Sequence, residues 1–130
     1  MASRIREICI NCTDPEAVAA FWSAALGYPE TDRDEECVQI MGATDRPSLL
    51  FVRTGDVGGP PKGGPNRLHI DLSPTDRDQD GEVARLEALG ATRIDIGQGS
   101  PTWVVLADPE GNEFCVLRTR VPAEPEPFGD

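Results

Sequence analysis

The sequence has few basic residues, a single histidine and no long apolar run. Lysine and arginine together number 12 against 23 aspartates and glutamates, which leaves a formal net charge of −11. Because nucleic acids and anionic membranes attract cationic proteins, this charge argues against both as partners. The apolar stretches are short and interrupted by charge, so none approaches the ~18 residues of a membrane-spanning helix. We therefore expect a soluble protein.

The N-terminal segment and the cysteines indicate the cytoplasm. Residues 1–7 lack the apolar core and the small-residue cleavage site of a secretory signal. A chain of 130 residues can bury enough apolar surface without disulfides, so we expect reduced thiols at Cys9, Cys12, Cys37 and Cys115. Cys9 and Cys12 have the spacing of some zinc and redox sites, but they lie in a predicted strand, where residues three apart point to opposite faces. We interpret them as small buried hydrophobes.

The first half of the chain predicts a strand, a helix and three further strands. Residues 5–12 alternate between two kinds of side chain, as in a half-buried strand. Asp14 and Pro15 suit a helix start, and an apolar stripe followed by Gly27 predicts a helix that ends at Leu26. The three strands are predicted over residues 30–33, 36–41 and 48–53.

The same order returns in the second half, after a segment rich in glycine and proline at residues 55–66, which we interpret as a linker. We predict a strand over residues 67–73, a helix over 80–89, and strands over 92–96, 102–107 and 113–118. The run Asp-Pro-Glu-Gly-Asn at 108–112 predicts a tight turn between the last two strands. Residues 121–130 are predicted to be a flexible tail.

Landmarks in the two halves repeat at a nearly constant shift. Asp14 matches Asp76, and the pair at 26–27 matches the pair at 89–90. We infer an internal duplication of one β-α-β-β-β module, over residues 4–54 and 67–119. Because neither module could bury its sheet alone, we expect a single α+β domain over residues 1–120. In it, two four-stranded sheets, each covered by a helix, would form a curved eight-stranded cup.

These motifs resemble the vicinal oxygen chelate superfamily, and within it the glyoxalase-like and bleomycin-resistance proteins. The resemblance is carried by Asp14-Pro15-Glu16-Ala17 with Phe21-Trp22 and Leu26-Gly27, by Asn66-Arg67-Leu68-His69-Ile70-Asp71, and by Asp108-Pro109-Glu110-Gly111-Asn112. It implies the tandem-module fold over nearly the whole chain. It does not select a reaction, since the superfamily contains isomerases, transferases, dioxygenases, epimerases and proteins that only sequester drugs.

The resemblance also implies where a divalent metal ion (Zn, Ni, Mn or Fe) would bind. Metal-dependent members take one ligand from the first strand and one from the last strand of each module. The matching positions are Glu7 and His69 in the first strands and Cys115 in the last strand. The fourth falls on Phe51, which has no ligand atom. Independently, strand alternation places Glu7, His69 and Cys115 opposite the apolar stripes, and their donor atoms suit Zn²⁺.

Each of these residues also has an ordinary structural explanation. A lone histidine on a strand is usually hydrogen bonded, and His69 with Asp71 could be a polar pair that lines the cup. Glu7 could be a solvated carboxylate, and Cys115 a small buried hydrophobe. Of the two tryptophans, Trp22 fits the helix core.

Trp103 shares strand parity with Val105, so it could line the cup and stack on a planar ligand. Together with Phe51 and Asp71, Trp103 is our candidate for substrate binding.

Two functions of different classes fit these residues. The first is a lyase or isomerase that binds a small molecule, in which Glu7 and His69 move a proton next to a carbonyl, with an optional metal ion. The second is a non-catalytic drug-sequestering protein, whose negative charge favours cationic compounds. An extradiol-type dioxygenase is disfavoured because a second histidine is missing. Exposed sheet edges predict a homodimer.

Overall fold

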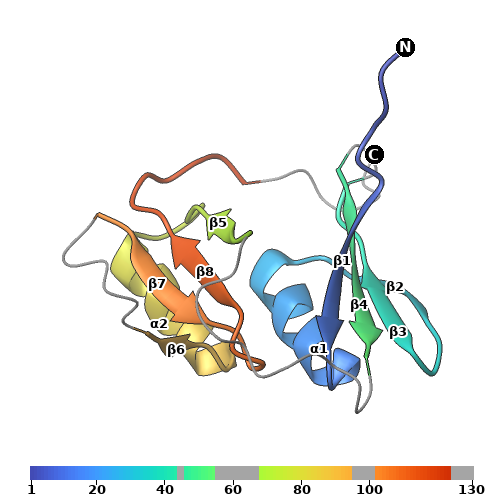
Figure 1. Cartoon of the computed structure of the whole chain (residues 1–130). Coiled ribbons are helices and arrows are strands. Elements are labelled where there is room, and N and C mark those ends of the chain that lie inside the picture. Colours follow the sequence, from blue (N-terminus) through green and yellow to red (C-terminus); the bar gives the residue numbers. More distant parts are fainter. Residues whose placement is uncertain (44–45, 55–67, 95–101, 124–130) are drawn as a thin grey trace. The chain divides into compact units, whose positions relative to one another are not determined.

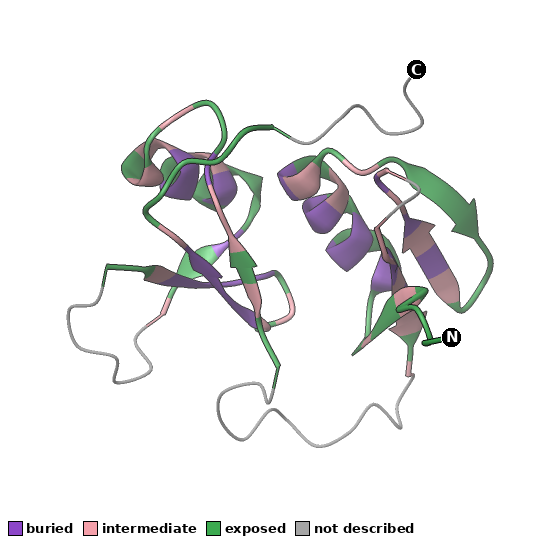
Figure 2. Cartoon of the chain, turned by 90° about the horizontal axis from the view of Figure 1, so that it is seen from above, coloured by how far each residue is buried: buried purple, intermediate pink, exposed green. Residues whose placement is uncertain are grey.

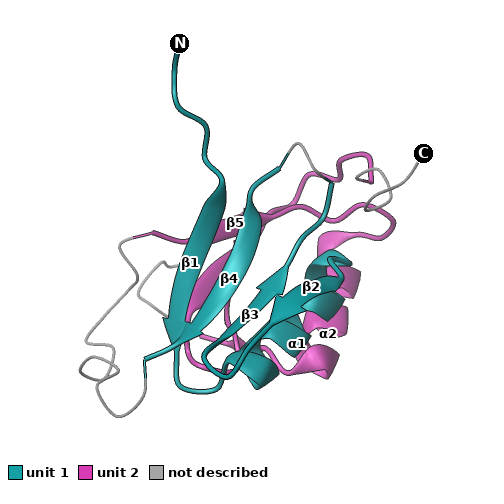
Figure 3. Ribbon diagram, turned by 90° about the vertical axis from the view of Figure 1, so that its right-hand side faces the viewer, with its two compact units in different colours: residues 1–59, 124–130 teal, residues 60–123 magenta. Residues whose placement is uncertain are grey.

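A computed structural model of the protein describes residues 1–43, 46–54, 68–94 and 102–123 (Figure 1). The chain divides into two compact units: unit 1 comprises residues 1–59 and 124–130, and unit 2 comprises residues 60–123 (Figure 3). Within the described ranges, each unit contains a four-stranded sheet and one helix. The predicted linker and most of the predicted tail lie outside the described residues.

Unit 1 follows the predicted order of elements. These are β1 (Glu7–Cys12), α1 (Pro15–Leu26), β2 (Glu30–Arg33), β3 (Cys37–Ile40) and β4 (Ser48–Arg53). The strand order in the sheet is β1-β4-β3-β2, with β1 parallel to β4 and the other neighbours antiparallel. Two predicted strands are shorter than expected, since β1 begins at Glu7 and β3 covers four residues.

Local interactions explain why α1 begins and ends where the sequence predicts. The Asp14 side chain accepts a hydrogen bond from the backbone N–H of Ala17 at 3.2 Å, and Pro15 occupies the first helical position. At the other end, Gly27 has φ 71° and its N–H donates to the carbonyl of Ser23 at 2.8 Å. Glycine adopts this left-handed conformation with little strain, so the helix ends there.

Helix α1 packs against β3 and β4, and the core of unit 1 lies between them (Figure 2). Trp22 is 2% exposed and Phe51 is 0% exposed. The Trp22 ring meets the ring of Phe21 edge to face, with centroids 5.2 Å apart. Trp22 is therefore a core residue, as predicted. Ile8, on the edge strand β1, remains 43% exposed because the helix covers the middle of the sheet.

Unit 2 repeats this arrangement. Its elements are β5 (Ile70–Leu72), α2 (Gln79–Leu89), β6 (Thr92–Arg93), β7 (Val104–Ala107) and β8 (Glu113–Val116). The strand order is β5-β8-β7-β6, with β5 parallel to β8 and the others antiparallel. The predicted strands over 67–73 and 92–96 each extend into residues outside the described ranges.

The two sheets have equivalent strand orders and directions, which confirms the predicted tandem β-α-β-β-β modules and the α+β class. The cup depends on how the units are arranged, so it stays a prediction. In the described part of the chain, no helix is long and apolar enough to cross a membrane.

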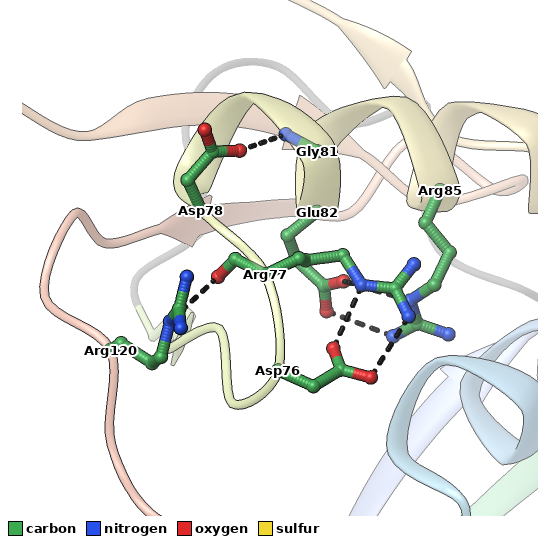
Figure 4. Close-up of polar contacts among 7 residues, drawn as sticks. All are labelled: Asp76, Arg77, Asp78, Gly81, Glu82, Arg85 and Arg120. Atoms are coloured by element: carbon green, nitrogen blue, oxygen red, sulfur yellow. Dashed lines mark hydrogen bonds and ion pairs between the residues drawn. The ribbon is translucent and has the colours of Figure 1, made fainter.

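A network of charged side chains fixes the start of α2 (Figure 4). The Asp78 carboxylate caps the helix by accepting the backbone N–H of Gly81 at 2.8 Å. Glu82 is 8% exposed, and its two carboxylate oxygens accept from the guanidinium of Arg85 at 2.8 Å each. Arg77 approaches the same carboxylate at 3.9 Å. Since buried charges are stable only when they are paired, we interpret this cluster as structural.

Candidate functional site

Strands β5 and β8 bring three reactive side chains to one face of the sheet in unit 2. Asp71 pairs with Cys115 in parallel register. His69 precedes Asp71 by two residues, and alternation places both side chains on the same side. Ile70 and its partner Phe114 face the other way, where Phe114 is 1% exposed and α2 packs against β8.

The three side chains form a compact group. His69 Nε2 lies 3.1 Å from Asp71 Oδ1. One ligand atom from each of His69, Asp71 and Cys115 falls within 4.8 Å of the others. The side chains of His69 and Asp71 are about half exposed, whereas Cys115 is 9% exposed. The sulfur atom is therefore the least accessible of the three ligand atoms, and a nitrogen and an oxygen are open to solvent.

The environment of Cys115 keeps its thiol protonated. Burial raises the pKa of Cys115, and the negative charge of Asp71 and a hydrogen bond with its carboxylate raise it further. Each effect disfavours a thiolate beside an existing anion. Asp71 thus interacts with both His69 and Cys115, and binding of a cation would have to displace the thiol proton.

The donor set of this group fits a divalent metal ion. Imidazole nitrogen, carboxylate oxygen and sulfur are all ligands of Zn²⁺, with bonds of about 2.0–2.3 Å. In a tetrahedral site such bonds place ligand atoms roughly 3.3–3.8 Å apart, so a group that spans 4.8 Å needs side-chain shifts of about 1 Å. The structure brings together His69 and Cys115 of the predicted ligands, and Asp71, predicted to contact substrate, lies with them.

Glu7, the other predicted ligand, belongs to unit 1. It occupies the first position of β1, and its carboxylate accepts hydrogen bonds from Gln39 Nε2 at 2.8 Å and from Ser48 Oγ at 3.2 Å. Its side chain lies on the opposite face of the strand from Ile8. That Glu7 acts together with His69 and Cys115 stays a prediction.

Phe51 does not occupy the position that the duplication predicts for it. In unit 2, Cys115 pairs with Asp71. The unit 1 equivalent of Asp71 is Cys9, two residues after Glu7, and Cys9 pairs with Leu50. The prediction is therefore wrong by one residue, and Leu50 is the counterpart of Cys115. Cys9 is exposed, so its predicted burial is wrong. Phe51 itself is fully buried, so it is a core residue and not a side chain available to a small molecule.

Trp103 lies just before β7 and is 42% exposed. It precedes Val105 by two residues, and Val105 pairs with Cys115. Its accessibility is compatible with the predicted stacking on a planar ligand, which stays a prediction.

Two residues that contact Glu7, Gln39 and Ser48, were not predicted from the sequence. Gln39 lies between Val38 and Ile40, and both neighbours are buried. A polar residue between two buried apolar residues of a strand must face the opposite side from them. This pattern could have placed Gln39 on the open face of the sheet, but its contact with Glu7 depends on the pairing of three strands.

Strand alternation also places the side chain of Glu113 on the face of β8 that carries Cys115, because Glu113 precedes Cys115 by two residues. Glu113 is 8% exposed.

Comparison with known proteins identifies the family. The model of the glyoxalase-like domain family matches residues 7–117, a range that begins at Glu7 and includes Cys115. The chain belongs to the glyoxalase-like family. Solved structures similar to this chain have the same fold. Among curated proteins, no match is found.

Three of the similar structures illustrate the range of this glyoxalase-like fold. A glyoxalase/bleomycin resistance protein/dioxygenase family enzyme from Burkholderia phytofirmans PsJN is 20% identical, with a TM-score of 0.67 and coverage of 88% of this chain and 97% of that chain. Lactoylglutathione lyase from Agrobacterium tumefaciens is 22% identical, with a TM-score of 0.58 and coverage of 89% and 93%.

The third structure is an E126Q mutant of the fosfomycin resistance protein FosX from Listeria monocytogenes, in complex with Mn(II) and 1S,2S-dihydroxypropylphosphonic acid. It is 16% identical, with a TM-score of 0.64 and coverage of 93% of both chains. At these identities the similarity establishes the fold and leaves the chemistry to the residues of this chain.

Proposed function

We propose that this glyoxalase-like protein binds a small molecule with a carbonyl group and acts on it as a metal-assisted lyase or isomerase. The observation that carries the proposal is the group of His69, Asp71 and Cys115 on one face of unit 2, with ligand atoms within 4.8 Å of one another. Two similar structures support it: a lactoylglutathione lyase and a fosfomycin resistance protein in complex with Mn(II).

In this proposal, His69, Asp71 and Cys115 would hold a divalent ion, and Glu7 would act as the base. The ion, when bound, supplies electrophilic polarisation of the substrate carbonyl. Oε2 of Glu7 then accepts the proton from the substrate carbon next to the carbonyl, and Glu7 returns that proton to the neighbouring carbon. His69 is oriented by its 3.1 Å contact with Asp71, which holds the imidazole in one direction whether it binds the ion or donates a proton.

A specific observation favours a second candidate, a binding protein that sequesters its ligand without chemistry. The raised pKa of Cys115 keeps a proton on a residue that must lose it to bind a metal ion. In this case His69 and Asp71 are polar contacts for the ligand, and the net charge of −11 favours a cationic compound.

Metal analysis separates the two candidates. Protein purified without chelator, and after incubation with Zn(II), Mn(II), Ni(II) or Fe(II), should hold about one equivalent of one ion. His69→Ala, Asp71→Asn and Cys115→Ser should each lower that content, whereas Cys9→Ser, which removes an exposed cysteine of unit 1, should not. A wild-type protein that binds none of the four ions would eliminate the metal-assisted mechanism.

A substrate-level test follows from the proton transfer. The loaded protein should catalyse exchange of the proton next to the carbonyl of a dicarbonyl–thiol adduct with D₂O, as followed by NMR, and Glu7→Gln should abolish that exchange. If a cationic drug raises the melting temperature while no adduct exchanges its proton, the sequestering function is correct instead.

A further inference from the structure

We infer that Gln39 and Ser48 are positioning residues for Glu7, which bind one carboxylate oxygen and leave the other for chemistry. The inference rests on the proposed function in one respect: it takes Glu7 as the base or ligand whose orientation matters. The contacts that support it lie entirely within unit 1.

The hydrogen bonds to Glu7 converge on a single atom. Gln39 Nε2 donates to Glu7 Oε1 at 2.8 Å, and Ser48 Oγ donates to the same oxygen at 3.2 Å. In the described part of the chain, no residue forms a hydrogen bond with Glu7 Oε2. A carboxylate held through one oxygen has a fixed plane and presents its second oxygen in one direction. This arrangement suits a residue that binds a metal ion or accepts a proton with Oε2.

The donors are themselves oriented by a row of polar residues across all four strands of the sheet. Thr31 Oγ1 in β2 donates to Gln39 Oε1 at 2.9 Å. Gln39 Nε2 also donates to Ser48 Oγ at 3.4 Å. The amide of Gln39 is therefore fixed at both ends, because the opposite orientation would place its carbonyl oxygen against the carboxylate. Every donor in the row points toward Glu7.

Strand geometry explains how these residues meet. Glu7 pairs with Ser48 across β1 and β4. Gln39 pairs with Leu50, two residues after Ser48, so it reaches Glu7 diagonally over β4. The register of β2 and β3 shifts at Thr31. Such a bulge redirects a side chain, and here it accompanies the bond from the Thr31 hydroxyl to Gln39.

The burial of the Ser48 hydroxyl supports a role in positioning Glu7 and not only in filling the core. It is 4% exposed, and its hydroxyl both accepts from Gln39 and donates to Glu7. A core position that needed only to be filled would be satisfied by an apolar residue. The hydroxyl instead extends the row to the carboxylate.

The first test measures the orientation of Glu7 in the metal-free protein. Three-bond NMR couplings of the Glu7 side chain should report one dominant rotamer in the wild type. Gln39→Leu removes both N–H donors at similar volume and should produce rotamer averaging, as should Ser48→Ala to a smaller degree. Asn11→Leu is the matched control, since Asn11 is an exposed amide on the same face of β1 and should leave the couplings unchanged. A single Glu7 rotamer in both Gln39→Leu and Ser48→Ala would overturn the inference.

The second test measures coupling to metal binding by titration of Mn(II) and Zn(II). Loss of a residue that orients a ligand typically lowers metal affinity 10–100-fold, so Gln39→Leu should weaken binding by about tenfold. In a Glu7→Gln background the same substitution should change affinity less than about twofold, because the residue it orients is no longer a carboxylate. An unchanged affinity in Gln39→Leu, or an equal loss in both backgrounds, would overturn the inference.

The two tests distinguish this inference from the proposed function. If the wild-type protein binds neither ion, the metal-assisted function fails, and the rotamer measurement still decides whether Gln39 and Ser48 hold Glu7. If Gln39→Leu does not fold, Ser48→Ala and Thr31→Val provide the same comparison, with Thr31→Val weakening the orientation of Gln39 alone.

Discussion

The turn that connects β7 to β8 comes directly before the strand that carries Cys115, and the contribution of its hydrogen bonds to stability can be tested. Asp108 is 3% exposed. Its Oδ1 accepts from the backbone N–H groups of Glu110 and Asn112 at 2.9 Å each, and the Asn112 side chain contacts both carboxylate oxygens at 3.2 and 3.0 Å. Gly111 has φ 88° and donates its N–H to the Asp108 carbonyl at 2.9 Å. One carboxylate thus organises the whole turn before Cys115.

We predict that Asp108→Ala destabilises the protein by about 3 kcal/mol. Hydrogen bonds to a charged acceptor contribute about 1.5–3 kcal/mol each, but bonds that share one acceptor are not additive. The alanine variant also leaves two backbone N–H groups in a part-buried turn without their acceptor. Asp108→Asn should lose about 1–2 kcal/mol, because the amide oxygen can still accept from the backbone.

Urea unfolding, followed by circular dichroism, measures these differences. Asp80→Ala is a suitable control because Asp80 is an exposed aspartate in the same unit, and it should change the free energy of unfolding by less than about 1 kcal/mol. If Asp108→Ala costs no more than Asp80→Ala, the carboxylate does not organise the turn and this reasoning is refuted.

Four further predictions follow from burial and packing. Trp22→Ala should lower the free energy of unfolding by about 3–5 kcal/mol, because Trp22 is 2% exposed; a loss below about 1 kcal/mol in urea would contradict its place in the core. Gly42→Ala should destabilise by about 1–3 kcal/mol, since its Cβ would lie 2.5–2.8 Å from ring atoms of Tyr28, and a Tyr28→Ala background should remove most of that cost. Burial and a neighbouring carboxylate raise the pKa of Cys115, so native-state alkylation mapped by mass spectrometry should modify the exposed Cys9 well before Cys115. The raised pKa means that the folded state holds the thiol proton of Cys115 more tightly than the unfolded state does. The free energy of unfolding of the wild type should therefore fall relative to that of Cys115→Ser as the pH rises through the pKa of Cys115, and parallel pH profiles of the two proteins would contradict this.

Most of the local structure was predictable because its causes are local. Asp14, Pro15 and Gly27 mark the ends of α1 through bonds that span at most four residues. Alternation along β5 and β8 placed His69 and Cys115 on the side opposite Ile70 and Val116, and the two sit together in the structure. The repeated order of elements was visible as a repeated pattern of caps and apolar stripes.

The prediction for Phe51 was wrong because it depended on the register of β4 to within one residue. Phe51 and Leu50 are adjacent apolar residues in β4, and nothing in their types says which of them faces α1. The pairing of β1 with β4 decides it, because a shift of one residue exchanges the two faces of a strand. The burial of Phe51 and the position of Leu50 opposite Cys9 follow from that pairing.

The sequence by itself thus determined which elements form, where α1 begins and ends, and that His69 and Cys115 lie opposite the apolar stripes of their strands, because these depend on interactions between residues close in the chain. Only the tertiary structure decided that Asp71 lies with His69 and Cys115, and that Gln39 and Ser48 hold Glu7. Apart from the contact of His69 with Asp71, those contacts join residues 32 to 44 positions apart, and their formation depends on strand pairing, which the apolar core selects as a whole.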